Sequence, residues 1–147
     1  MGYEKVRLPI ILLAVFPVSM VWYVIILYKF RRQGYKCLIN HRKKKKHRNF
    51  SKENQILYAK KLVIFYRLLG HVFGERNNCL ERASTLYFSL QYLGLETSLL
   101  IGKQKSRMSN SHILHAWVEV SETPINEYYG IRKDFNIIMT IKDGIII

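Results

Sequence analysis

An uncharged run near the N-terminus constrains the fold of this chain more than any other feature. Leu8–Tyr28 reads LPIILLAVFPVSMVWYVIILY and contains no Asp, Glu, Lys or Arg. As a helix it extends about 31 Å, close to the hydrocarbon thickness of a bilayer. Lys29, Arg31 and Arg32 come directly after the run, as basic residues do after a membrane span. No cleavage pattern of a signal peptide follows the run. The run predicts a membrane-embedded, single-pass helix; the alternative is a helix buried against the rest of the chain.

Basic charge is concentrated in the same part of the chain. The net charge is +14, and residues 1–48 hold 12 Lys/Arg against one acid. If the helix spans, the ten Lys/Arg of residues 29–48 place the C-terminal part at the cytoplasmic face of a bacterial membrane; otherwise the chain is cytoplasmic. RKKKKHR (42–48) is typical of a solvated linker that contacts anionic lipid. No aromatic residue interrupts it and no nucleic-acid-binding fold surrounds it, so we do not expect a nucleic-acid partner.

Periodicity divides the chain into three parts and predicts an α+β fold. The parts are an apolar helix with basic flanks (1–32), a basic linker (33–50) and a folded domain (51–147). Two segments of the domain have helical spacing, residues 51–70 and residues 79–92, and Gly94 follows the second as a stop signal. The segments with strand character are 96–102, 112–120, a short piece near Ile125, and 135–141, with Ile145–Ile147 pairing back after a turn.

The two cysteines, Cys37 and Cys79, lie in very different surroundings and do not indicate a disulfide framework. Cys37 is followed by His41 and His47, which are metal-type residues, but the run of lysines between them repels a cation. We therefore expect no metal site, and nothing in the sequence indicates a cofactor.

Cys79 stands where a helical pattern begins. Asn77 and Asn78 favour the N-cap position, which places Cys79 in the first turn. The free N–H groups and the positive end of the helix dipole stabilise a thiolate there, and the thiolate is the nucleophilic form of cysteine. Glu81 opposes this effect and Arg82 offsets it. The alternative is an inert, buried thiol.

His115 is the candidate general base. In HILHAWVEV the alternation places His115 on one strand face with Trp117 and Glu119. A base needs an orienting group, and a turn near Ser121–Pro124 brings the following residues back beside it. If residue 120 pairs with residue 125, Asn126 faces the ring; with one more residue in the loop, Glu127 does. The sequence leaves both open.

An ordered set of motifs resembles a known family. The set consists of C-L-E-R-A at 79–83, L-G at 93–94, I-G at 101–102, H-A-W-V-E-V at 115–120 and I-N-E at 125–127. It resembles the transglutaminase-like leader proteases of lasso peptide biosynthesis, the microcin J25-processing type, over about residues 50–141. The resemblance implies a papain/transglutaminase-like fold with Cys79 as nucleophile and His115 as base. The third member falls at Glu127, where the family has Asp, and Asn126 is the fallback. Asn77 or Asn78 would help the Cys79 N–H to hold the oxyanion.

The resemblance also implies a function and partners. Such a cysteine endopeptidase removes the leader of a ribosomally made precursor peptide, and a separate ATP-dependent lasso cyclase then closes the ring of the bacteriocin-type product. Residues 1–48 leave no room for a precursor-recognition domain, so we expect the split form, which needs a separate small leader-recognition protein. The alternative is a catalytically degenerate component that binds the precursor or scaffolds the maturation complex.

Overall fold

A computed structural model describes residues 4–34, 51–73, 78–105 and 113–147, with the backbone alone for residues 4–16. The helices are α1 (Glu4–Gln33), α3 (Lys52–Val72), α4 (Cys79–Tyr92) and the short α5 (Ile131–Asp134). The strands are β1 (Thr97–Gln104), β2 (Leu114–Val120), β3 (Thr123–Pro124), β4 (Phe135–Lys142) and β5 (Ile145–Ile146). The predicted α+β class is confirmed, and every predicted strand segment of the domain is present.

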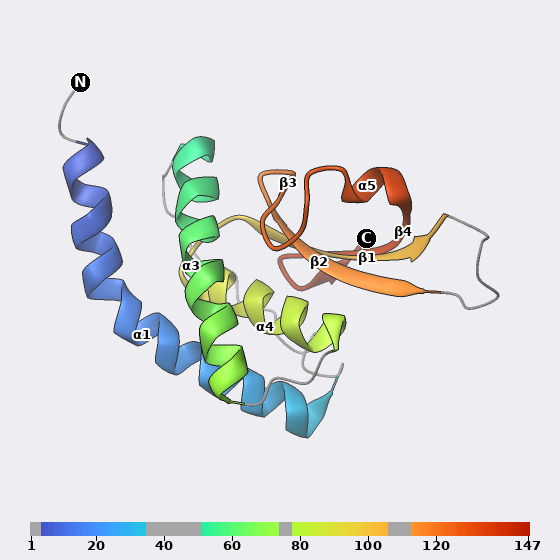
Figure 1. Ribbon diagram of the computed structural model, residues 1–147, viewed down its shortest axis with the longest axis horizontal. Helices are drawn as coiled ribbons and strands as arrows, with labels where there is room; N and C mark the ends of the chain where they lie inside the picture. The colour runs from blue at the N-terminus through green and yellow to red at the C-terminus, as the bar shows by residue number, and fades with distance from the viewer. Residues whose placement is uncertain (1–3, 35–50, 74–77, 106–112) are drawn as a thin grey trace.

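The strands form one antiparallel sheet in the order β3-β2-β1-β4-β5. Helix α4 packs on β1 and β2, and α1 and α3 pack on α4 from the other side (Figure 1). The main core lies between helices and sheet, where β2 contributes Ala116, Val118 and Val120. On the opposite face Trp117 packs with Leu100 and with Ile131 of α5. This alternation confirms the strand faces predicted for HILHAWVEV.

The second half of α1 is part of the domain. Tyr23, Ile26, Leu27 and Phe30 are buried in the main core, and the Tyr23 ring stacks on Tyr66 of α3 with centroids 4.6 Å apart. Among the described residues, no helix has the length and apolarity that a bilayer crossing requires. The predicted membrane span is not found among these residues, and the alternative of a helix packed on the domain is seen for the second half of α1.

Helices α3 and α4 both begin at a capping residue, and for α4 this is Asn78, one of the two predicted caps. Ser51 accepts a hydrogen bond from the Asn54 N–H at 3.4 Å, and Asn78 accepts one from the Leu80 N–H at 3.0 Å. On α3 Tyr58 and Ala59 are buried, whereas Leu57 and Phe65 are exposed. Helix α4 is buried on nearly all sides from residue 81 to residue 91, as expected of a helix between two layers.

Gly102 fits a place on the sheet that has no room for a side chain. It pairs with His115 across β1 and β2 and lies next to a register shift between β1 and β4. A Cβ at this position would lie 2.9 Å from the Trp117 ring and 2.9 Å from the Phe135 Cβ. The glycine therefore lets Trp117 and Phe135 close over the strand beside His115.

We expect Gly102→Ala to lower the free energy of unfolding by about 1–3 kcal/mol, because an added methyl group overpacks this site. Urea denaturation of the purified chain measures the change. Gly130→Ala is the matched control, since its Cβ would first meet the exposed Tyr128 ring at 3.3 Å. Equal stability of Gly102→Ala and the wild type would show that the packing around Trp117 is loose.

Candidate active site

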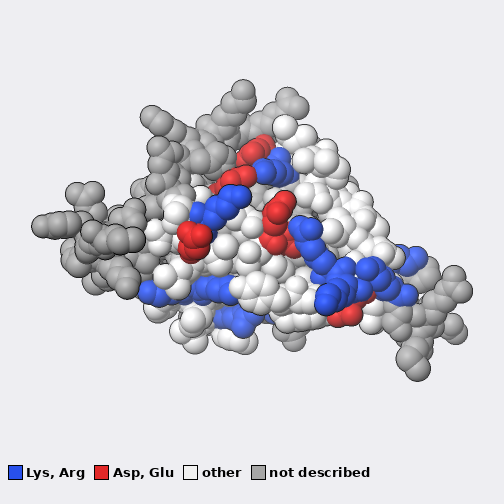
Figure 2. Space-filling view, turned by 90° about the horizontal axis from the view of Figure 1, so that it is seen from above, with Lys and Arg blue, Asp and Glu red and all other residues white. Residues whose placement is uncertain are grey.

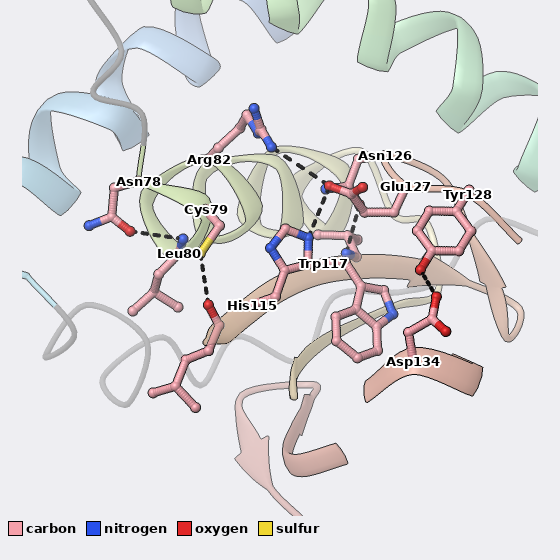
Figure 3. A network of polar contacts seen from close by, with 12 residues as sticks. Asn78, Cys79, Leu80, Arg82, His115, Trp117, Asn126, Glu127, Tyr128 and Asp134 are labelled. Carbon is pink, nitrogen blue, oxygen red and sulfur yellow. Dashed lines mark hydrogen bonds and ion pairs between the residues drawn. The ribbon is translucent and has the colours of Figure 1, made fainter. Parts of the chain in front are cut away.

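Cys79 is the first residue of α4 and a free, half-buried cysteine. Because the Asn78 side chain caps Leu80, the first turn keeps its N–H groups close to the cysteine. The Sγ atom donates a weak hydrogen bond to the carbonyl oxygen of Leu114 at 3.8 Å. Leu114 directly precedes His115, so the thiol lies against the strand that carries the histidine (Figure 3).

The imidazole of His115 is half-buried near the start of β2. Its ring lies near-parallel to Trp117, with centroids 6.3 Å apart, and tilted against Phe135 at 5.4 Å. Trp117 is fully buried and donates a hydrogen bond from Nε1 to Glu119 at 3.0 Å. The two aromatic side chains shield part of the ring from water, and Trp117 lies on the same strand face as His115, as predicted.

Glu127 is the acidic partner of that ring. Its Oε1 lies 3.2 Å from His115 Nε2, and both side chains are about four-fifths buried. With Nε2 directed at the carboxylate, Nδ1 is the nitrogen left for another partner. Figure 3 shows the cysteine on the other side of the ring from Glu127. Cys79, His115 and Glu127 thus come together from α4, β2 and the loop after β3.

Asn126 points elsewhere and holds the loop in place. Its Oδ1 accepts a hydrogen bond from the Val118 N–H at 2.8 Å, and its backbone oxygen accepts one from Arg67 Nη2 at 2.9 Å. The neighbouring Ile125 N–H donates to the Val118 oxygen at 3.1 Å. The Asn126 side chain therefore gives the Val118 N–H of β2 the acceptor that a neighbouring strand would otherwise provide. Glu127 is the residue that faces the imidazole.

The register that brings these residues together is not either of the two predicted ones. Val120 pairs with Thr123, so the hairpin turn consists of Ser121 and Glu122 alone. Both have positive φ, 48° and 64°, as the tight turns that suit a hairpin twist require. The predicted turn was longer because neither residue type favours this conformation strongly.

Ion pairs around the site differ from the predicted arrangement. Glu81 is buried and accepts from Arg31 Nε of α1 at 2.7 Å, so Arg31 rather than Arg82 neutralises it. Arg82 instead lies 3.6 Å from Oε1 of Glu127, the same oxygen that faces the imidazole. Acidic side chains also lie beside basic ones across the face in Figure 2.

A second buried carboxylate fixes the tryptophan behind the histidine. Glu119 is buried and binds Arg132 through both carboxylate oxygens, with Nε at 2.8 Å from Oε1. The hydrogen bond to Glu119 raises the pKa of Arg132, so the guanidinium stays charged. Since Oε1 also accepts from the indole of Trp117, this pair orients the ring that shields His115.

The other candidate residues take different roles or lie beyond the description. Asn78 serves as the N-cap, and in Figure 3 its amide nitrogen points away from Cys79. Asp134 accepts a hydrogen bond from the Tyr128 hydroxyl, which raises the pKa of Tyr128, and it does not contact the imidazole. Asn77 lies outside the described residues, as do the metal-type residues Cys37, His41 and His47. Within the described ranges no group of three or more His, Cys, Asp and Glu has metal-site geometry.

Comparison with known proteins now decides the family. The family model of the Transglutaminase-like superfamily matches residues 20–140. The chain belongs to the transglutaminase-like superfamily. Members of this superfamily are often cysteine hydrolases, which is consistent with a cysteine peptidase-type activity of this transglutaminase-like domain. The match begins inside α1, in the half that packs on the domain. Neither the curated proteins nor the solved structures gave a match.

If His115 activates the thiol, we expect iodoacetamide to modify Cys79 about tenfold faster in the wild type than in His115→Ala at pH 6, because an imidazolium stabilises the thiolate. Mass spectrometry of tryptic peptides measures the rate. Cys37 provides an internal reference that the substitution should leave unchanged. Identical Cys79 rates in the two proteins would show that the imidazole does not act on the sulfur.

Proposed function

We propose that this transglutaminase-like chain is a cysteine endopeptidase with Cys79 as nucleophile, His115 as general base and acid, and Glu127 as the residue that orients the imidazole. One observation carries the proposal: a cysteine at a helix N-terminus, a half-buried histidine and a carboxylate 3.2 Å from its Nε2 meet from three separate segments. This combination meets the requirements for an activated thiol nucleophile.

The proton path follows from the orientation of the ring. Glu127 accepts the Nε2 hydrogen of His115, which leaves the Nδ1 lone pair as the base. Cys79 transfers its thiol proton to Nδ1 after its Sγ rotates away from the Leu114 oxygen. The Glu127 carboxylate then stabilises the imidazolium, and the Trp117 and Phe135 rings limit access of water to it.

The covalent steps balance with water as the only other reactant. The Cys79 sulfur attacks the scissile carbonyl carbon, and the Cys79 N–H in the first turn of α4 donates to the oxyanion. The C–N bond then breaks while His115 gives its proton to the leaving amine. Water attacks the resulting thioester, His115 takes a proton from it, and the sulfur leaves as the thiolate that closes the cycle.

We propose the leader of a lasso-type precursor peptide as the substrate. The ordered motifs C-L-E-R-A, H-A-W-V-E-V and I-N-E support this assignment, since they resemble the leader proteases of that pathway over most of the domain. The proposal brings partners with it: the precursor peptide, a separate small leader-recognition protein, and an ATP-dependent lasso cyclase that acts on the released core peptide.

A non-enzymatic role has one observation in its favour. The Cys79 thiol donates to the Leu114 carbonyl oxygen instead of to the imidazole. A domain that keeps this arrangement would bind or scaffold the precursor without cleaving it. The substitution of the family's Asp by Glu127 points the same way, because the longer side chain demands a different loop position. The loop, which the Asn126 hydrogen bond holds against β2, places Glu127 so that its longer side chain reaches the imidazole.

We expect the chain to cleave a lasso-type precursor in the presence of its leader-recognition protein, and Cys79→Ala to abolish cleavage. His115→Ala should lower kcat/KM by at least about 10²-fold, because it removes both proton transfers. Mass spectrometry of leader and core fragments measures the reaction. Cys37→Ala is the control and should keep wild-type activity. Binding of the precursor without cleavage by the wild type would favour the scaffolding role.

Arg82 should act as a positioning residue for the acid. It shares Oε1 of Glu127 with the imidazole and lies one turn after Cys79 on the same helix. We expect Arg82→Met to lower kcat/KM about tenfold and Arg82→Lys to restore most of it, because the cation holds the carboxylate in place beside the ring. The ion pair is long and its Arg82 side chain is exposed, so it adds little stability and the melting temperature should change little.

The matched control is Lys142→Met, which removes a basic side chain as exposed as Arg82 and breaks its pair with Glu96. We expect it to leave cleavage unchanged. Glu127→Gln should lower kcat/KM more than Arg82→Met does, since it removes the carboxylate itself. If Arg82→Met is as active as Lys142→Met, the ion pair with Glu127 does not serve the reaction.

A further inference from the structure

The outer face of α1 is an apolar surface that nothing in the described chain covers. Val18, Val21, Ile25 and Tyr28 are 49%, 60%, 47% and 68% exposed. Their spacing of three and four residues places them on one side of the helix, and we call these four residues the outer stripe. Tyr23, Ile26, Leu27 and Phe30 on the inner side are buried in the main core.

A helix on the surface of a globular domain normally has a polar outer face. The second half of α1 is uncharged on both faces until Lys29, so packing on the domain explains only its inner side. Four exposed apolar side chains along one side of a helix indicate a surface that binds a partner when the protein functions.

The charge around the outer stripe favours an anionic bilayer surface as its binding partner. Arg32 is exposed and continues the line of the outer stripe at helical spacing after Tyr28. Residues 1–48 carry 12 of the 24 Lys/Arg of the chain and one acid, so the stripe lies in its most basic part. Two copies of this chain would repel each other there, whereas acidic phospholipids would be attracted.

We propose that α1 lies along the surface of an anionic membrane with its outer stripe among the lipid headgroups, while its inner side stays on the domain. Apolar residues on one side with a tyrosine and an arginine at the polar border are typical of helices in this position. The helix then holds the peptidase domain at the membrane without crossing it. At the cytoplasmic face of a bacterial membrane, acidic lipids provide the required charge.

The test uses flotation of the full-length chain with vesicles of phosphatidylglycerol and phosphatidylcholine in equal parts, and with vesicles of phosphatidylcholine alone. We expect the wild type to float with the acidic vesicles and to bind them less at high salt. The double substitution Val21→Asp with Ile25→Asp should lower the bound fraction at least about tenfold. Ile138→Asp, at an equally exposed residue of β4, is the matched control and should bind like the wild type.

Arg32→Glu provides a second variant that leaves the apolar packing intact. It should weaken binding to the acidic vesicles at least about fivefold and leave binding to the neutral ones unchanged. Circular dichroism confirms that each variant is folded. Failure of the wild type to float, or equal flotation of the stripe variant, would overturn the proposal. So would a dimer in light scattering that the stripe variant abolishes, with no lipid binding. Because flotation needs no cleavage, these outcomes are independent of the peptidase assignment.

Discussion

The geometry of the site depends on one hydrogen bond between a side chain and a strand. The hairpin of β2 and β3 ends after Pro124, and the Val118 N–H would lose its acceptor there. The Oδ1 of Asn126 replaces that acceptor at 2.8 Å, in a place where an unsatisfied buried N–H costs about 1–3 kcal/mol. The next residue is then held against the imidazole. Arg67 fixes the same loop from α3 through the Asn126 carbonyl, so helix and sheet both determine where Glu127 lies.

Charge pairs tie the three contributors to the site together. Arg82 joins the helix of the nucleophile to the loop of the acid, and Arg31 joins α1 to the first turn of α4 through the buried Glu81. Breaking a buried pair on one side leaves an uncompensated charge, which is strongly destabilising. The Arg31–Glu81 pair therefore fixes the end of α4 that presents Cys79, and α1 belongs to the architecture of the site although it contributes no reacting group.

Sequence patterns predicted the elements well and the contacts between them poorly. The cap at Asn78, the glycine stop after α4 and the alternation around Trp117 depend on neighbours in sequence, so the sequence alone could predict them. The hairpin register depended on two residues with positive φ that no glycine or asparagine announced. The partner of Glu81 lies 50 positions earlier in the chain, and no local pattern specifies such a pair. For the same reason the strand pattern alone left both Asn126 and Glu127 open, although only Glu127 reaches the ring.

Hydropathy counts apolar residues but does not say which side of a helix each one occupies. In the second half of α1 that difference matters, because the side chains of residues 18–28 divide between a buried face and an exposed one. Arg31 and Arg32 divide in the same way: the first turns inward to Glu81, and the second continues the outer stripe. Adjacent residues on a helix point about 100° apart. One arginine can therefore contact the domain while the next one contacts a lipid surface. In the proposed arrangement α1 can therefore pack on α4, the helix that carries Cys79, and also hold the domain at a membrane.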